Sequence, residues 1–282
     1  MQQTDGQPPT ESPASTEPPP PPPVPEAPPP VPKAPLPKFC RDCGAAWQLE
    51  WATCAACVAR AATPAPSPDT SRPVGSALAL YFAWLGISTV TILWSMFGGS
   101  EEITVELAST VASAMLVLAW CVPARRELGP PLLRCPHLGW FALAAVGAAC
   151  TYSVASGAVA LLNQFVELVD LRYTDAFFDS GYGWGAAVLC ICVQPAVIEE
   201  LAFRGIIFGA LRRVLEPMEA VLVSTLMFMI LHLAVASFPH LFVIGLLLGW
   251  MRMHTGSMYP GMLLHFLHNF LVVLNERGLW PW

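Results

Sequence analysis

The sequence predicts an all-α fold: a polytopic transmembrane helical bundle of about seven helices, preceded by a disordered proline-rich tail and a small four-cysteine module. Of the 282 residues, 55% are hydrophobic and only 12% are charged, whereas soluble domains carry about 25% charged residues. Apolar runs of about twenty residues recur from Ser76 to the C-terminus, and each can cross a hydrocarbon core of about 30 Å. The alternation typical of barrel strands is absent.

The composition divides the chain into four parts. The predicted parts are a disordered tail (1–38), a zinc-ribbon-like module (39–58), a linker (59–75) and the transmembrane domain (76–282, with its motifs in 183–274). The tail is rich in proline, includes the run Pro18–Pro23, and is expected to have polyproline II character. It is a spacer or a docking site for a proline-binding partner.

Four cysteines precede the membrane domain in a C-x2-C-x10-C-x2-C array: Cys40, Cys43, Cys54 and Cys57. Thiolates at this spacing can close a tetrahedral site for structural zinc. A module of about 20 residues cannot build a core of its own, so the metal would supply most of its folding energy. The array resembles the minimal zinc ribbons at the ends of many bacterial membrane proteins.

Seven apolar runs are predicted to cross the membrane: Ser76–Phe97, Ile103–Val122, Leu138–Val166, Gly183–Arg212, Ala220–Ala236, Leu241–Met253 and Tyr259–Leu274. The fourth is long enough to tilt or break near Pro195, and the sixth is short for a full crossing. Arginines lie in alternate loops, which predicts a cytoplasmic N-terminus and an external C-terminus. The reducing cytosol would then favour zinc over disulfides in the cysteine array.

Ionisable residues inside a membrane are costly, and each is a candidate for function. Glu200 and Arg204 are four residues apart and therefore meet on one helix face. Glu199 lies about 100° around the helix and is left as the unpaired carboxylate. The purely structural alternative places both carboxylates in one ion-pair network. No other intramembrane carboxylate is expected to compete.

Two further runs bring polar groups to the same depth. His232 follows Phe228 by four residues, and His265 and Asn269 lie one turn apart, with His268 slightly off their face. Glu199, His232 and His265 form a two-histidine, one-carboxylate set that can hold a divalent metal and a water nucleophile. Glu199 can alternatively deprotonate a water directly, and the Asn269 amide suits a developing oxyanion. A single histidine in an apolar helix is, however, commonly a core residue.

Small residues mark the sixth run. Gly245 and Gly249 form a face through which helices, or a substrate backbone, can approach closely, and helix packing is the simpler role.

At these residues the sequence resembles the CPBP intramembrane proteases, also called ABI or CAAX prenyl protease type II-like proteins. The family pattern is E-E-x-x-x-R, F-x-x-x-H, an F-x-x-G-x-x-x-G-like segment and H-x-x-x-N. It reads here as Glu199–Arg204, Phe228–His232, Phe242–Gly249 and His265–Asn269, in the same order. The resemblance covers about a third of the chain.

The resemblance implies an intramembrane endopeptidase. It assigns activation of the water to Glu199, a place around that water or a metal to His232 and His265, and polarisation of the scissile carbonyl to Asn269. Glu200 and Arg204 match supporting positions. The substrate would be a membrane protein or peptide, and nothing points to nucleic acid or to prenylated substrates. The alanine- and proline-rich composition suggests a bacterial plasma-membrane protein.

Two other functions fit parts of the sequence. A non-enzymatic membrane scaffold would recruit cytosolic partners through the cysteine array and the proline tract. A transporter would need polar groups along a pathway, and the first three runs offer little beyond Asn163 and Gln164.

Overall fold

The structure, a computed structural model, describes residues 38–39, 46–47, 71–97, 102–165 and 172–279. The proline-rich tail and the four cysteines of the predicted zinc module lie outside these residues. Two short strands, β1 (Lys38–Phe39) and β2 (Ala46–Trp47), pair antiparallel and flank Cys40 and Cys43 in the sequence.

The rest of the described chain is helical. Its separate helices are α2 (Ser71–Phe97), α3 (Glu102–Cys121), α4 (Arg125–Leu133), α5 (Gly139–Leu162), α6 (Asp175–Asp179), α10 (Pro217–Leu231), η4 (Val235–Ser237), α11 (Phe238–Thr255) and α12 (Tyr259–Glu276). One longer helical segment, between α6 and α10, is built from α7 (Gly183–Ala187), η2 (Val188–Val193), α8 (Gln194–Glu200), η3 (Leu201–Ile207) and α9 (Phe208–Leu211).

Each predicted apolar run corresponds to a helix or to this composite segment, so the helical-bundle prediction is confirmed. Seven crossings were predicted, but α10, with 15 residues, and α12 are not among the helices long and apolar enough to cross a membrane. The first helix begins at Ser71, inside the predicted linker. The sixth run is longer than expected: Val235–Thr255 is helical over 21 residues and is long enough to cross a membrane. The two short helices α4 and α6 were not predicted, because neither has an apolar run.

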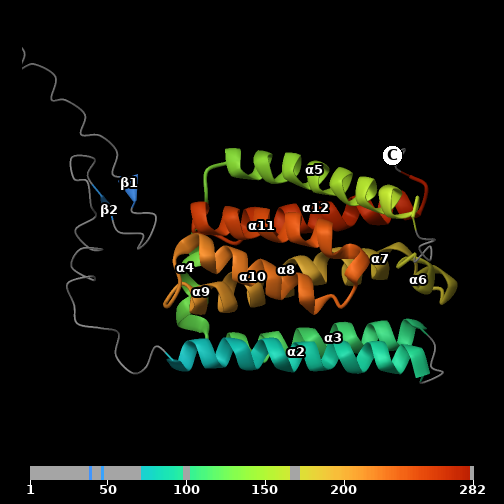
Figure 1. Cartoon of the computed structure of the whole chain (residues 1–282), viewed down its shortest axis with the longest axis horizontal. Helices are drawn as coiled ribbons and strands as arrows, with labels where there is room; N and C mark the ends of the chain where they lie inside the picture. Colours follow the sequence, from blue (N-terminus) through green and yellow to red (C-terminus); the bar gives the residue numbers. More distant parts are fainter. Residues whose placement is uncertain (1–37, 40–45, 48–70, 98–101, 166–171, 280–282) are drawn as a thin grey trace, which may run out of the picture. The chain divides into compact units, whose positions relative to one another are not determined.

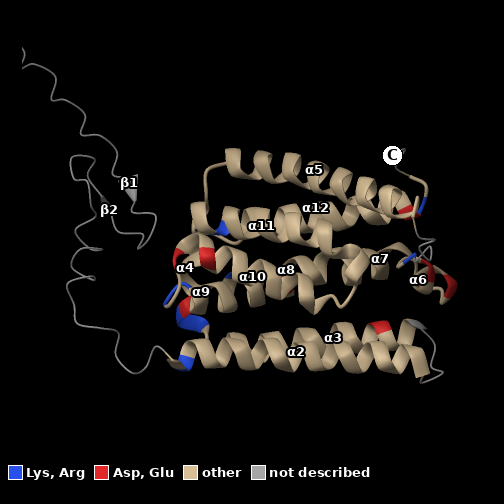
Figure 2. Cartoon of the chain, viewed as in Figure 1, with Lys and Arg blue, Asp and Glu red and all other residues tan. Residues whose placement is uncertain are grey.

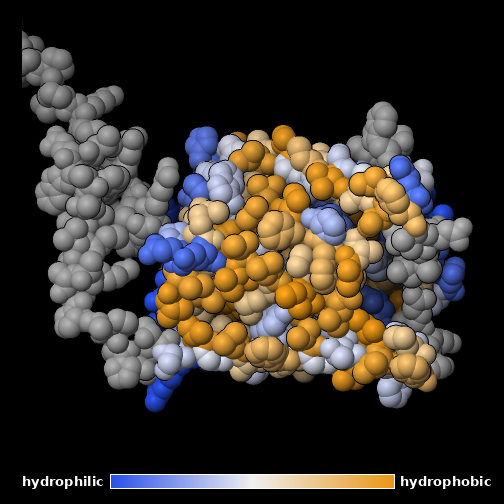
Figure 3. Space-filling view, viewed as in Figure 1, coloured by the Kyte–Doolittle hydropathy of each residue, from blue (hydrophilic) through white to orange (hydrophobic). Residues whose placement is uncertain are grey.

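The protein is a multi-pass membrane protein. Five helical segments are long and apolar enough to cross a bilayer: Ser71–Phe97, Ile103–Cys121, Gly139–Leu162, Gly183–Leu211 and Val235–Thr255. Large apolar side chains lie exposed along them, such as Phe82, Leu93 and Met115 at 62%, 50% and 67%. The visible face of the bundle is accordingly mostly apolar (Figure 3), a surface that suits lipid rather than water. The charged residues gather toward the two ends of the helices (Figure 2).

The central position of the composite segment determines where the site forms. Helices α2 and α3 pack against each other on one side of it, and α5 packs on α11 and α12 on the other (Figure 1). The composite segment contacts α3, α10 and α12. Side chains on α8 can therefore meet residues from both halves of the bundle.

The small-residue face of α11 serves helix packing. A Cβ on Gly249 would lie 2.9 Å from Val221 Cγ1, and one on Gly245 would lie 3.0 Å from Thr225 Cγ2. Both neighbours belong to α10, so the glycines let α10 and α11 approach closely. The carbonyl of Gly245 also accepts a hydrogen bond of 3.2 Å from Arg204 Nη2.

Turns of π-helix flank α8 on both sides. The wide turns η2 and η3 precede and follow the short helix that carries Glu199 and Glu200. The missing N–H of Pro195 falls at the start of α8, so the segment stays helical there instead of breaking. Such wide turns within longer helices are frequent at functional sites, because they re-aim side chains and release backbone carbonyls.

Candidate active site

A cavity of about 360 Å³ lies between the composite segment, α10, α11 and α12. Glu199, His232, His265 and Asn269 all line it. They come from three helical segments that are far apart in sequence. The structure thus confirms the predicted convergence of these side chains on one cavity; their catalytic roles remain predictions.

Glu200 and Arg204 form the ion pair that their spacing predicts. Arg204 Nη1 donates to Glu200 Oε1 at 3.0 Å, and the two residues are 1% and 0% exposed. The Arg204 guanidinium also lies 4.6 Å from the centre of the Phe228 ring. Burial of two charges is tolerable because they neutralise each other and make further contacts. The pair lies behind the cavity wall and supports it.

Glu200 also orients the first of the two predicted histidines. His265 Nδ1 lies 3.2 Å from Glu200 Oε1. A carboxylate can only accept, so Nδ1 carries the proton and donates it. In the neutral ring the other nitrogen, Nε2, then has a free lone pair.

Glu199 faces this nitrogen without bonding to it. Its Oε2 atom is buried, has no hydrogen-bond partner among the described residues, and lies 3.8 Å from His265 Nε2. That distance is too long for a direct hydrogen bond. Because Oε2 is buried, a water can lie between the two groups only after they separate; it would then donate to both, which are acceptors when Glu199 is ionised and His265 is neutral.

His232 has its tautomer fixed by the backbone. The residue caps the C-terminal end of α10, and its Nδ1 lies 2.9 Å from the carbonyl oxygen of Phe228, one turn earlier. Nδ1 must therefore donate, which leaves Nε2 as the acceptor. The ring also packs edge-on against Phe228, with centroids 4.8 Å apart.

Asn269 is held by a carbonyl of the wide turn η2. Its Nδ2 donates a hydrogen bond of 2.9 Å to the carbonyl oxygen of Ile191. An amide carries two N–H donors, so a second one remains for a ligand in the cavity. The sequence carries one sign of this anchor: the residue four positions after Ile191 is Pro195, which has no N–H to donate to that carbonyl.

A catalytic metal held by Glu199, His232 and His265 stays a prediction. Among the residues that the structure describes, no three His, Cys, Asp or Glu side chains lie together in a way that could hold an ion. Glu199 and His265 face each other, and His232 lines the same cavity.

The cavity is also lined by polar residues that the sequence did not single out. Glu106 belongs to the membrane span Ile103–Cys121 and lines the cavity, so the expectation that no other intramembrane carboxylate competes is wrong. His240 and His268 also line it and stack with centroids 6.4 Å apart. His268 Nδ1 lies 3.0 Å from Thr151 Oγ1 on α5. The sequence gave neither histidine a role, because His240 lies at the start of α11 and His268 lies off the face of α12 that carries His265.

Comparison with known proteins supports the resemblance seen in the motifs. Residues 182–271 match the family model described as type II CAAX prenyl endopeptidase Rce1-like. The match spans about a third of the chain and includes all four motifs and most of the residues around the cavity. No curated protein and no solved structure matches the chain. The match supports a CAAX-type membrane protease acting on membrane-associated substrate, without resolving its mechanism.

Proposed function

We propose that the protein is an intramembrane endopeptidase that hydrolyses a peptide bond with a water activated by Glu199. The main support is the position of Glu199 Oε2. This buried atom has no hydrogen-bond partner among the described residues, lies 3.8 Å from His265 Nε2, and belongs to a residue that lines the cavity. A carboxylate in this position can bind and deprotonate a water. The match to a CAAX prenyl endopeptidase family model independently supports peptide-bond hydrolysis.

The proposed reaction uses Glu199 first as a base and then as an acid. A water donates one hydrogen to Glu199 Oε2 and the other to His265 Nε2, and Glu199 takes its proton as the oxygen attacks the scissile carbonyl carbon. The second amide hydrogen of Asn269 stabilises the developing oxyanion. Glu199 then passes the proton to the leaving nitrogen, so the carbon–nitrogen bond breaks with no net gain or loss of protons.

The remaining residues position this machinery. Arg204 neutralises Glu200, and Glu200 in turn holds His265 with its Nδ1–H as donor. His232 presents Nε2 as an acceptor, which suits a hydrogen bond to the substrate backbone N–H. We expect the protein to lie in the plasma membrane with a cytoplasmic N-terminus, as the placement of its arginines indicates.

We further propose that the cysteine array binds structural zinc. Support comes from the C-x2-C spacing and from the antiparallel strands β1 and β2, which flank Cys40 and Cys43 in the sequence. The scaffold alternative depends on this module and the proline tract.

The test is cleavage by purified protein in detergent or vesicles, with Glu199→Gln beside the wild type. The proposal expects that Glu199→Gln abolishes hydrolysis while membrane insertion and thermal unfolding stay unchanged. Full activity of Glu199→Gln would overturn it and favour the scaffold. A chelator arm, run on protein lacking residues 1–70, reports separately on any catalytic metal.

A further inference from the structure

The cavity occupies only one end of the helical bundle. The connectivity places the start of α2, the helix α4, the end of α9 and the start of α12 at one end, and α6 and the α10–α11 connection at the other (Figure 1). The lining of the cavity reaches residues that lie toward the second end: Glu106, Tyr173, Ala234, Ser237 and His240. The cavity therefore runs from mid-bundle toward that end.

Packed side chains close the route toward the first end. Leu128, Met251 and Met258 are 3%, 0% and 1% exposed. A Cβ on Gly205, the residue after Arg204, would contact both Leu128 and Met258. Among the described residues, these packed side chains fill the space beside Gly205 toward α4 and the start of α12.

Hydrogen bonds hold this closed end together. Arg252 Nε donates to the carbonyl oxygen of Arg204 at 3.0 Å, which ties α11 to η3. Tyr259 Oη donates to the carbonyl oxygen of Leu132 at 2.6 Å, which ties the start of α12 to α4. The closed end is thus a rigid, cross-linked layer rather than a loose seam.

The closed end is also the arginine-rich end (Figure 2). Of the described arginines outside the site, those at the closed end are Arg72, Arg125, Arg126, Arg134, Arg212, Arg213 and Arg252, and those at the other end are Arg172 and Arg277. Loops enriched in Arg and Lys stay in the cytoplasm. The closed end is therefore cytoplasmic, and the end with the cavity is extracytoplasmic.

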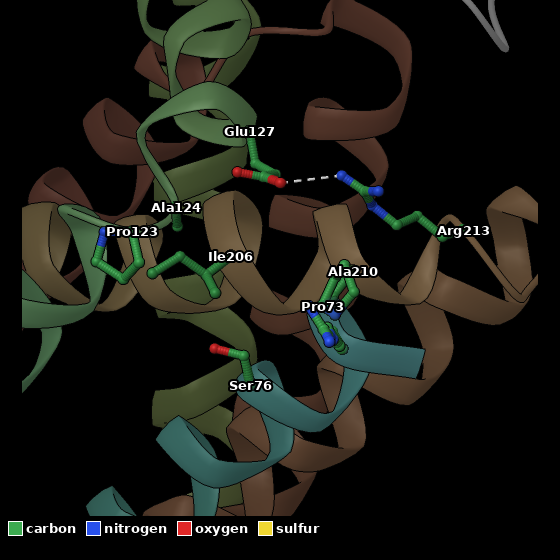
Figure 4. A pocket seen from close by; sticks show the side chains of 9 residues that line it. Pro73, Ser76, Pro123, Ala124, Glu127, Ile206, Ala210 and Arg213 are labelled. Carbon is green, nitrogen blue, oxygen red and sulfur yellow. Dashed lines mark hydrogen bonds and ion pairs between the residues drawn. The ribbon is translucent and has the colours of Figure 1, made fainter. Parts of the chain in front are cut away.

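A second cavity lies at the arginine-rich end but offers no alternative site. It measures about 350 Å³ and is lined by residues such as Ser76, Ala124 and Ile206 (Figure 4). Its carboxylate, Glu127, accepts a hydrogen bond of 3.0 Å from Arg213 Nη2. No histidine is among the described residues that line it, so these residues offer no acid–base pair for hydrolysis.

We propose that the catalytic cavity opens only to the extracytoplasmic side of the membrane. Its substrates are then membrane-associated proteins or peptides whose scissile bond has already been carried across the membrane. A tail that is presented from the cytoplasm would meet the closed end. The direction of opening rests on geometry and charge alone, whereas the substrate class rests on the proposed protease function.

The first experiment is labelling with a membrane-impermeant charged maleimide, read out peptide by peptide by mass spectrometry. Ser237→Cys reports on the cavity, Ser180→Cys on the exposed loop before α7, and the native, exposed Cys135 on the α4–α5 connection. In intact cells we expect Ser237→Cys and Ser180→Cys to be labelled at least about tenfold faster than Cys135, because a charged reagent cannot cross the hydrocarbon. Inverted vesicles should reverse the order.

Labelling of Ser237→Cys from the side that labels Cys135 would overturn the proposal. So would a failure to label Ser237→Cys from the side that labels Ser180→Cys.

The second experiment adds a quenched fluorescent peptide outside vesicles that contain the intact protein in mixed orientation. Cleavage should scale with the fraction of molecules whose Cys135 is protected inside. If the cysteines are labelled from the expected sides but no peptide is cleaved, the protease function is refuted and the direction of opening stands.

Discussion

His265 Nδ1 and Glu200 Oε1 lie 3.2 Å apart across two helices, and the same carboxylate oxygen accepts from Arg204 at 3.0 Å. One oxygen atom thus joins α8, η3 and α12. The arrangement links the stability of the bundle to the orientation of a site residue, and it leads to the first prediction.

Glu200→Gln should be strongly destabilising. The substitution keeps the size of the side chain but leaves the buried Arg204 without a counter-charge, and loss of one partner of a buried ion pair costs about 3–5 kcal/mol. Thermal unfolding in detergent measures the loss. The double variant Glu200→Gln/Arg204→Met should be more stable than Glu200→Gln alone, and an equal or lower stability would count against this account.

Glu199→Gln should lower kcat by about 10²–10⁴ or more with little change in unfolding temperature, since general base catalysis contributes that much. The matched control is Glu106→Gln, which removes the other intramembrane carboxylate of the cavity. We expect Glu106→Gln to keep most of the activity. The reverse pattern would transfer the base role to Glu106.

Asn269→Ala should lower kcat by about 10²–10³ with a smaller change in KM, because an oxyanion donor acts mainly in the transition state. The variant also loses the bond to the Ile191 carbonyl, which costs about 1 kcal/mol of stability. Steady-state kinetics beside thermal unfolding separates the two effects. A drop in stability without a drop in kcat would make Asn269 a structural residue only.

Gly249→Ala should destabilise the contact between α10 and α11 by about 1–3 kcal/mol. The new methyl group would lie 2.9 Å from Val221 Cγ1, on a β-branched side chain with little freedom to move. The control is Gly209→Ala, since nothing lies within 4 Å of a Cβ there. Adding Val221→Ala to Gly249→Ala should restore part of the lost stability.

Removal of residues 1–70 should leave peptide cleavage intact, since α2 begins at Ser71 and the described residues that line the cavity all follow it. Cys40→Ser should reduce the bound zinc of the full chain, measured by atomic emission, without loss of hydrolysis. Inactivation of the truncated protein despite normal membrane insertion would make the N-terminal module part of the catalytic unit.

The apolar runs predicted the membrane helices well, because each long run has one way to satisfy its backbone in lipid. The i, i+4 spacing likewise predicted the Glu200–Arg204 pair, because helix geometry alone brings those side chains together. The convergence of Glu199, His232 and His265 followed from their shared depth in the membrane and from the family resemblance.

The remaining features depend on contacts between segments that no local pattern announces. Glu106 joins the cavity because α3 packs against α8. The anchor of Asn269 uses the Ile191 carbonyl, which Pro195 leaves without an α-helical donor, but no local pattern pairs that carbonyl with α12. The side of the membrane on which the cavity opens required both the charge pattern of the loops and the packing of the closed layer.

The wide turns around α8 make the effect of a change in chain length depend on where it falls. Each residue of an α-helix advances the side-chain direction by about 100°, and a π-helical turn holds about one residue more than an α-helical turn. Deletion of one residue between Val188 and Val193 would therefore let that stretch relax to an α-helix with Glu199 still directed toward His265. Deletion of one residue between Gln194 and Ile198, in the regular helix, would instead rotate Glu199 away from His265, although no side chain of the site had changed.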